Sequence, residues 1–161
     1  MRKGELRFQD ALETFARHQV DFVVVGGVAA VLDGAPIATF DLDIVHRRDP
    51  DNVELLMTAL GEMDARYRDL AGRRLRPEAT GLAGVGHHLL QTSFGPLDVL
   101  GHIGEAAGYA ELLPDSAEHP LAQYTIRVLN LRRLIAEKER MNRDKDRAVL
   151  AILRRTLEES G

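Results

Sequence analysis

Two aspartates lie one residue apart in an otherwise apolar, β-branched stretch, Thr39–Val45, which reads TFDLDIV. Side chains alternate between the two faces of a β-strand, so Asp41 and Asp43 share one face of the strand that this stretch predicts. Two like charges this close repel each other and are costly to remove from water. A divalent cation such as Mg²⁺, which prefers oxygen ligands, resolves both problems. Paired acids are also common on exposed strands, so a second feature has to distinguish a metal site from a solvated surface.

A pair of glycines, Gly26 and Gly27, supplies that second feature. They end the β-branched stretch DFVVVG, which predicts a buried strand, and open GVAAVLDG, which predicts a helix. A glycine turn at the start of a helix exposes backbone N–H groups and the positive end of the helix dipole to phosphate. Tight turns also use glycine for purely conformational reasons. A phosphate-binding turn beside metal-binding acids is the combination that chemistry on nucleoside triphosphates requires.

The spacing of these residues resembles the signature of the polymerase-beta-like nucleotidyltransferase superfamily: VGG, thirteen residues, then DLDI. Thr39, just ahead of the acids, is also usual there, and the resemblance implies a third acid on a later strand. Asp98, within the apolar segment GPLDVLG, fits that role. The alternative for Asp98 is an exposed residue near a turn, which we disfavour because an unpaired acid in an apolar run is costly. The resemblance therefore implies that Asp41, Asp43 and Asp98 bind Mg²⁺ and are the catalytic residues.

The C-terminal segment LRRLIAEKERMNRDKDRAVLAIL resembles the closing segment of AbiEii-type toxins and related small nucleotidyltransferases. The shared pattern is a Lys near a helix end, an Arg, and a Lys-Asp pair that opens the next helix, matched here by Lys138, Arg143, Lys145 and Asp146. Lys138 and Asp146 each continue the apolar stripe of a predicted helix, where solvated charges are normally absent. The two residues form a buried ion pair, or they line the nucleotide site, and both can hold. By resemblance, the nucleotide-binding residues are Gly26, Gly27, Thr39, Lys138, Arg143 and Asp146.

The periodicity of the chain predicts an α/β fold. The resemblance implies a small mixed β-sheet flanked by helices, the fold of polymerase-beta-like nucleotidyltransferases. Strands are expected at 21–26, 39–45, 87–92, 96–101 and 124–129, the third and fourth forming a hairpin around SFG. Helices are expected at 5–18 and 27–34, from Pro50 after the N-cap Asp49, after the N-cap Asn130, and after the N-cap Asp144. Residues 64–86 are expected to form a loop, and residues 101–120 a loop with a short helix.

At 161 residues, the chain predicts one domain, 1–161, in which helices at about 130–159 complete the nucleotide site. The absence of cysteine excludes disulfides and thiolate metal sites, and a net charge of −4 argues against a chain that binds nucleic acid through overall basic charge. The longest apolar run, 22–32, is too short to cross a bilayer, and the N-terminus lacks the apolar region of a signal peptide. We therefore expect a cytoplasmic protein with no membrane partner.

Two further groups of charged or titratable residues stand out. A cluster of arginines is usually a solvated surface and can also hold a phosphate backbone: Arg66, Arg68, Arg73, Arg74 and Arg76. Histidines near the predicted strands are expected to have structural or solvent roles: His46, His87 and His88. Ile37 stands where the family often has a basic residue, which removes one phosphate or substrate contact.

Together with the resemblance, these residues predict a Mg²⁺-dependent nucleotidyltransferase that moves a nucleoside monophosphate from a nucleoside triphosphate to an acceptor. We expect the acceptor to be RNA or protein, because a compact domain has little chain to spare for enclosing a small acceptor. The chain would then be the toxin of a toxin–antitoxin system, with an antitoxin partner. One alternative is an adenylyltransferase that modifies a small molecule such as an antibiotic. The other is a catalytically inactive module that binds a nucleotide or a partner.

Overall fold

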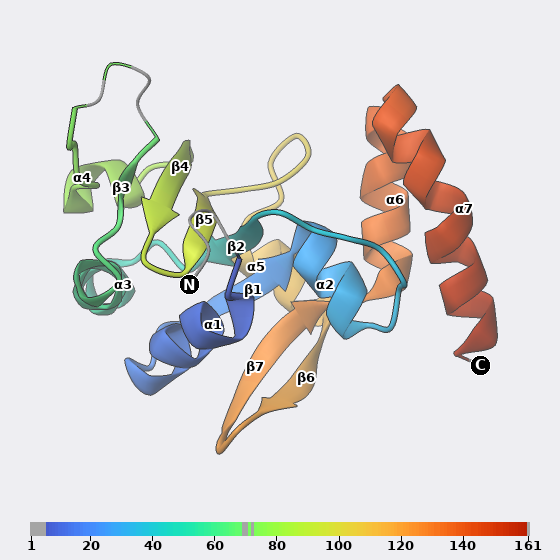
Figure 1. Cartoon of the computed structure of the whole chain (residues 1–161), viewed down its shortest axis with the longest axis horizontal. Helices are drawn as coiled ribbons and strands as arrows, with labels where there is room; N and C mark the ends of the chain where they lie inside the picture. Colours follow the sequence, from blue (N-terminus) through green and yellow to red (C-terminus); the bar gives the residue numbers. More distant parts are fainter. Residues whose placement is uncertain (1–5, 69–70, 72, 161) are drawn as a thin grey trace.

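The computed structural model describes residues 6–68, 71 and 73–160, and these residues form one mixed seven-stranded sheet (Figure 1). The strand order is β3-β4-β5-β2-β1-β7-β6. The strands are β1 Phe22–Val25, β2 Leu42–His46, β3 Arg66–Tyr67, β4 His87–Thr92, β5 Gly95–Leu100, β6 Ser116–Leu121 and β7 Tyr124–Leu129. β2 runs parallel to β5 and β1 runs parallel to β7, whereas the other neighbours are antiparallel. The predicted α/β fold with a mixed sheet is confirmed.

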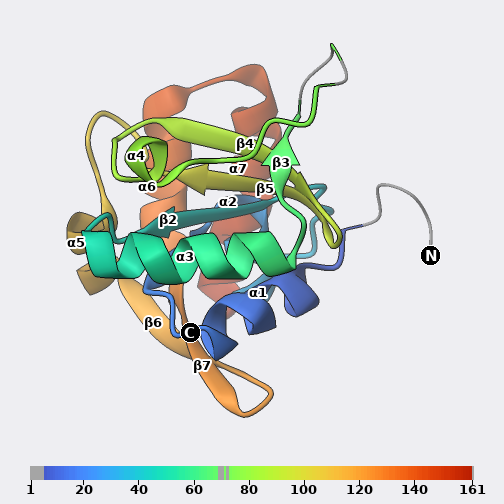
Figure 2. The same cartoon turned by 90° about the vertical axis from the view of Figure 1, so that its left-hand side faces the viewer.

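Helices cover both faces of this sheet. Seen from the side, α1 and α3 lie in front of the strands, while α2, α6 and α7 lie behind them (Figure 2). The helices are α1 Phe8–Arg17, α2 Gly26–Leu32, α3 Pro50–Glu62, α4 Ala79–Leu82, α5 Tyr109–Leu112, the short 3₁₀ helix η1 Leu113–Asp115, α6 Leu131–Met141 and α7 Asp144–Glu159. The predicted first helix begins at Phe8, and Glu5, its expected first residue, lies outside the described residues.

The core lies on both sides of the central strands. All four residues of β1 are buried, because β2 and β7 flank it and helices cover both of its faces. On β2, Leu42 and Ile44 are fully buried on the face opposite Asp43. α1 buries Leu12 and Phe15 against the same core. The acids of interest therefore extend from a rigid, close-packed part of the molecule.

The region between β5 and β7 differs from the prediction. The expected short helix is present as α5, but residues 116–120, the end of the predicted loop, belong to the edge strand β6, Ser116–Leu121, which pairs along the whole of β7. β6 reads SAEHPL, a sequence whose polar residues and Pro120 do not predict a strand. An edge strand tolerates both, because one of its sides pairs with no other strand. The predicted loop 64–86 likewise contains the two-residue strand β3 and the single turn α4.

Local capping signals predict three helix starts, two of them correctly. The Asp49 carboxylate accepts from Asn52 N at the start of α3, and Asn130 Oδ1 accepts from Arg133 N, 2.9 Å away, at the start of α6. The expected break after α6 occurs at Asn142, which adopts a left-handed conformation with φ 49°. The N-cap of α7 is Arg143 rather than Asp144, because the side chain of Asp146 reaches back to the Arg143 N–H at 3.3 Å.

None of the described helices combines the length and the apolar character that a membrane crossing requires.

Candidate active site

The paired aspartates and the third acid meet at the centre of the sheet. Because β2 and β5 are parallel neighbours, Asp43 lies directly opposite Asp98. β2 begins at Leu42, three residues after the start of the predicted strand 39–45, so Asp41 lies just before the strand. Its carboxylate still lies on the same side as that of Asp43. One carboxylate oxygen from each of Asp41, Asp43 and Asp98 lies within 4.8 Å of the others. We call these three residues the acidic triad.

The glycine pair makes room for this site. Gly26 has φ +66°, and a side chain there would place its Cβ 2.3 Å from Asp43 Oδ2. A Cβ at Gly27 would lie 2.6 Å from Thr39 Oγ1, and that hydroxyl donates to the Asp41 carbonyl at 3.1 Å. The backbone where β1 meets α2 therefore packs directly against Asp43 and against Thr39, the residue whose hydroxyl holds the chain just ahead of β2. Only glycine permits both the left-handed conformation and these close approaches.

The triad carries more negative charge than its surroundings neutralise. Burial, together with the charges of Asp41 and Asp98, raises the pKa of Asp43 from 3.8 to about 8. Burial and the neighbouring Asp98 also raise the pKa of Asp41. Asp43 Oδ1 is buried and has no hydrogen-bond partner among the described residues. A buried carboxylate oxygen without a donor is rare in folded proteins, so the site is short of positive charge.

A divalent cation fits this set of donors. Oxygens bound to one Mg²⁺ at about 2.1 Å lie within about 4.2 Å of each other, so the triad needs only small side-chain rotations to meet around one ion. The unpartnered Asp43 Oδ1 would gain a ligand bond, and the repulsion among the three acids would fall. The residues that would hold the ion are Asp41, Asp43 and Asp98.

Arg68 is a residue of this site that the sequence pattern did not distinguish. Its Nη2 lies 2.5 Å from Asp98 Oδ1, and its Nη1 donates to the Leu90 carbonyl at 2.7 Å. In the sequence it is one of five clustered arginines, and no spacing rule separates it from the others. Its place follows from β3, which pairs antiparallel with β4, so that Arg68, directly after β3, still lies along β4 with its backbone N donating to the Leu89 carbonyl. Arg76, from the same arginine cluster, instead pairs with Asp64.

The C-terminal residues form a second charged group, which we call the C-terminal ion cluster: Lys138, Arg143 and Asp146. Asp146 is 1% exposed, and it pairs with Arg143 Nε at 2.6 Å and with Lys138 Nζ at 3.4 Å. These contacts join α6 to α7, so the predicted buried ion pair is present. Among the described residues, no hydrogen bond or ion pair links this cluster to the acidic triad. Its predicted contact with a nucleotide stays a prediction.

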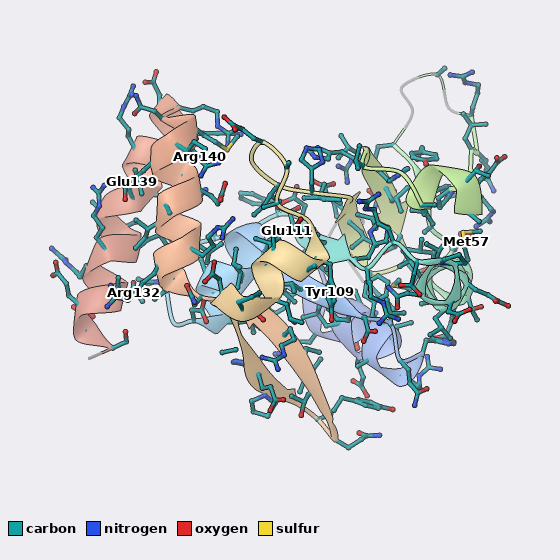
Figure 3. All side chains as sticks on the ribbon, turned by 180° about the vertical axis from the view of Figure 1, so that it is seen from behind. Met57, Tyr109, Glu111, Arg132, Glu139 and Arg140 are labelled. Atoms are coloured by element: carbon teal, nitrogen blue, oxygen red, sulfur yellow. The ribbon has the colours of Figure 1, made fainter. Side chains whose placement is uncertain are left out.

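A cavity of about 710 Å³ lies at the other end of β2 and β5. It is lined by residues that follow these strands and by α5, including His46, His102, Tyr109 and Glu111, and the acidic triad is not part of its lining. Figure 3 labels Tyr109 and Glu111 on α5. His46 is fully buried and its Nε2 lies 2.7 Å from the Leu82 carbonyl, in line with the structural role expected of it. Because none of the triad carboxylates lines this cavity, we do not assign it to the chemistry of the triad.

No known protein family matches the chain, and no curated protein matches it in sequence. Two solved structures share its fold. One is a protein of Thermotoga maritima provisionally named a nucleotidyltransferase, which is 16% identical with a TM-score of 0.56, over 96% of this chain and 96% of that one. The other is the lincosamide antibiotic adenylyltransferase LnuA with lincomycin bound, which is 13% identical with a TM-score of 0.60, over 94% of this chain and 98% of that one. At these identities the likeness defines the fold, which is that of the nucleotidyltransferases, as predicted.

Proposed function

We propose that this chain is a nucleotidyltransferase that transfers a nucleoside monophosphate from a nucleoside triphosphate to an acceptor hydroxyl and releases pyrophosphate. The observation that carries the proposal is the acidic triad, in which a buried oxygen of Asp43 finds no hydrogen-bond partner in the described part of the chain. This triad lies in a fold shared with proteins named as nucleotidyltransferases. An acid arrangement this costly in the absence of a cation is expected where a protein binds one.

The residues of the triad hold Mg²⁺ in this proposal. When bound, the metal activates the attacking hydroxyl and stabilises the charge that develops on the leaving oxygen. Gly26 leaves room for the Asp43 side chain and Gly27 for Thr39, and in this proposal the triphosphate approaches the backbone where β1 meets α2. Thr39 sets the conformation of the chain that leads into Asp41.

We also propose that the C-terminal ion cluster contributes to nucleotide binding. Lys138 is a quarter exposed and gives one of its three ammonium donors to Asp146, so two donors remain for a phosphate. Arg143 is nearly half exposed, so it too can reach a ligand. Asp146, which is buried beneath both, holds the two cations in place rather than contacting the nucleotide itself.

The proposed acceptor is RNA or a protein, with the chain acting as the toxin of a toxin–antitoxin system. The support is the resemblance of residues 131–153 to the closing segment of AbiEii-type toxins. The arginine cluster supports an RNA acceptor less than its composition suggests, because Arg66, Arg68 and Arg76 are already paired with acids. An open surface beside the triad would still admit the end of a polymer or a partner's side chain.

A second candidate is a small-molecule adenylyltransferase that acts on an antibiotic. The specific observation in its favour is the likeness to LnuA, which extends over nearly the whole of both chains. That likeness concerns the fold, and the acceptor has to be found by experiment.

The test incubates the purified protein with Mg²⁺ and each of the four α-labelled nucleoside triphosphates. Parallel reactions contain total RNA, lysate proteins, a lincosamide or an aminoglycoside, and a matched set contains EDTA. Label in RNA or protein supports the first candidate, and label in the antibiotic supports the second. A protein that binds labelled nucleotide but transfers it to nothing would support an inactive binding module, and the proposed function would then be wrong.

A further inference from the structure

Arg68 is tied to the sheet at one end and to the acidic triad at the other. Its backbone N donates to the Leu89 carbonyl at 3.1 Å, and its Nη1 donates to the Leu90 carbonyl at 2.7 Å. Its Nη2 reaches Asp98 Oδ1 at 2.5 Å. The guanidinium therefore bridges the backbone of β4 and a carboxylate oxygen of the triad, with one terminal nitrogen on each.

The contact with Asp98 places a positive charge where the triad needs one. Among the described residues, Arg68 is the partner in the one ion pair that Asp41, Asp43 or Asp98 makes. A metal ion that binds the triad takes Asp98 as a ligand, and it also repels a guanidinium a few Å away. Metal and guanidinium thus compete for the same acid.

The backbone anchor decides what happens to Arg68 after this competition. The hydrogen bond to Leu90 keeps the guanidinium beside the site when Asp98 is released, because it uses the other terminal nitrogen. A nucleotide bound through the metal brings phosphate oxygens next to Asp98. Arginine, with its planar fork of donors, is well suited to contact them.

We propose that Arg68 is an exchangeable counter-ion: it neutralises Asp98 in the metal-free protein, releases Asp98 when a divalent cation binds, and then contacts the phosphates of the metal-bound nucleotide. The second half of this inference rests on the proposed function, whereas the first half concerns the metal alone. The competing explanation is a structural one, in which Arg68 only fastens β3 to β4 and β5.

The experiment compares Arg68→Gln with Arg76→Gln. Arg76 is a matched control, because it also pairs with an aspartate at 2.5 Å and also donates to a backbone carbonyl, at 3.3 Å, but its aspartate is Asp64, outside the triad. Glutamine keeps a donor for the backbone anchor and removes the charge. Arg68→Lys keeps the charge and serves as the second variant, and the folding of each variant is checked by circular dichroism and melting.

The first readout is the binding of Mn²⁺ alone, followed by electron paramagnetic resonance of the free ion. We expect Arg68→Gln to bind Mn²⁺ about tenfold more tightly than the wild type, since one competing unit charge is removed at short range. Arg76→Gln should match the wild type, and Arg68→Lys should lie much closer to the wild type than Arg68→Gln does. Unchanged Mn²⁺ affinity in Arg68→Gln, or an equal change in Arg76→Gln, overturns the counter-ion role.

The second readout is calorimetric titration with a non-hydrolysable nucleoside triphosphate at saturating Mn²⁺. Here the expected change has the opposite sign: Arg68→Gln should bind the nucleotide about tenfold more weakly, because it lacks the phosphate contact. A variant that binds the nucleotide as well as the wild type overturns the phosphate contact. If the wild type binds Mn²⁺ but no nucleotide, the proposed function fails while the counter-ion role still stands or falls on the Mn²⁺ result. A wild type that binds no Mn²⁺ overturns both.

Discussion

Two aspartates with little exposure to solvent, Asp146 and Asp43, have opposite electrostatic environments in this molecule. Asp146, in the C-terminal ion cluster, accepts hydrogen bonds from Lys138 and from the backbone and side chain of Arg143. Hydrogen bonds from Arg143 and the charge of Lys138 lower the pKa of Asp146 below its usual value. Asp43, in the acidic triad, has a buried oxygen that no described residue contacts by a hydrogen bond, and burial raises its pKa to about 8.

The difference separates an acid that completes the fold from an acid whose charge the described residues leave largely uncompensated. A carboxylate whose acceptor sites are filled by fixed cations is stabilised in its charged form and ties its neighbours together. A carboxylate that is buried beside two further acids destabilises the folded chain in its charged form, and in the proposed function a bound cation removes that cost. The four predictions that follow test this contrast.

The largest effect is expected on activity from Asp43→Asn. Loss of one charged metal ligand should lower nucleotidyl transfer about a thousandfold or more, because metal stabilisation of the transition state is worth several kcal/mol and each 1.4 kcal/mol is tenfold. Asp41→Asn and Asp98→Asn should behave alike. The melting temperature without metal should stay the same or rise, since repulsion among the acids is relieved.

The measurement is label transfer with Mg²⁺, alongside melting with and without the metal. Asp64→Asn, an acid outside the triad, serves as the control for activity. Transfer that persists in any of the three triad variants would remove that residue from the metal site.

The next largest effect is expected on stability from Asp146→Ala. The variant loses the bridge between α6 and α7 and part of the α7 cap, so the free energy of unfolding should fall by about 3 kcal/mol. The expected loss is modest for a broken buried ion pair, because the partly exposed Lys138 and Arg143 regain water once Asp146 is gone. Urea unfolding measures the change.

The control for that prediction is Asp144→Ala on the same helix. Asp144 pairs with Arg147, but its side chain is 93% exposed, so the expected loss is within about 0.5 kcal/mol. Equal losses in the two variants would mean that burial of Asp146 contributes nothing beyond a surface pair.

A third effect concerns pH, and the two acids should act with opposite signs. The folded pKa of Asp43, about 8, exceeds its ordinary value of 3.8, so the folded chain holds a proton that the unfolded chain has lost. Asp43 should therefore make the metal-free protein less stable as the pH rises from about 4 to about 8. The pKa of Asp146 is lowered, so its stabilisation is present above about pH 4 and is lost as the pH falls through its folded pKa.

Urea unfolding across pH 3–9 in EDTA checks both signs. Asp43→Asn should flatten the decline between pH 4 and pH 8, and Asp146→Ala should flatten the acid limb. A divalent cation should reduce the decline in the wild type, and the part that remains comes from Asp33 outside the triad, whose pKa is raised by burial to about 6. A stability curve of the wild type that rises steadily from pH 4 to pH 8 would contradict the assignment to Asp43.

The smallest effect on stability is expected from Lys138→Ala. Arg143 still pairs with Asp146 in this variant, so the free energy of unfolding should fall by about 1 kcal/mol. If Lys138 also contacts the triphosphate, the free energy of nucleotide binding should weaken by more than the free energy of unfolding does, which means a loss of affinity of about tenfold or more. Calorimetric titration of nucleotide, beside urea unfolding, separates the two roles. Unchanged affinity would leave Lys138 a purely structural residue.

The candidate site could be predicted from the sequence only in part. Alternation along a strand places Asp41 and Asp43 on one face whatever surrounds them, and the glycine pair marks a turn. Asp98 came from a resemblance, because its position opposite Asp43 depends on β2 pairing parallel to β5 across more than fifty residues of chain. Arg68 had no local signal at all: among five arginines, the sheet alone selects the one that reaches the triad.

The same division holds for the fold. Helix starts at Asp49 and Asn130 and the break at Asn142 follow from contacts within a few residues, so sequence by itself determines them. The sequence does not predict β6, because its polar residues form a strand only by hydrogen bonding to the exposed edge of β7. Tertiary structure decided what nearby residues could not: Arg143, three residues away, supplies the first partner of Asp146, whereas the burial of Asp43 and the charge of Asp98 beside it come from segments that only the folded sheet brings together, and the pKa of a carboxylate follows that burial and charge.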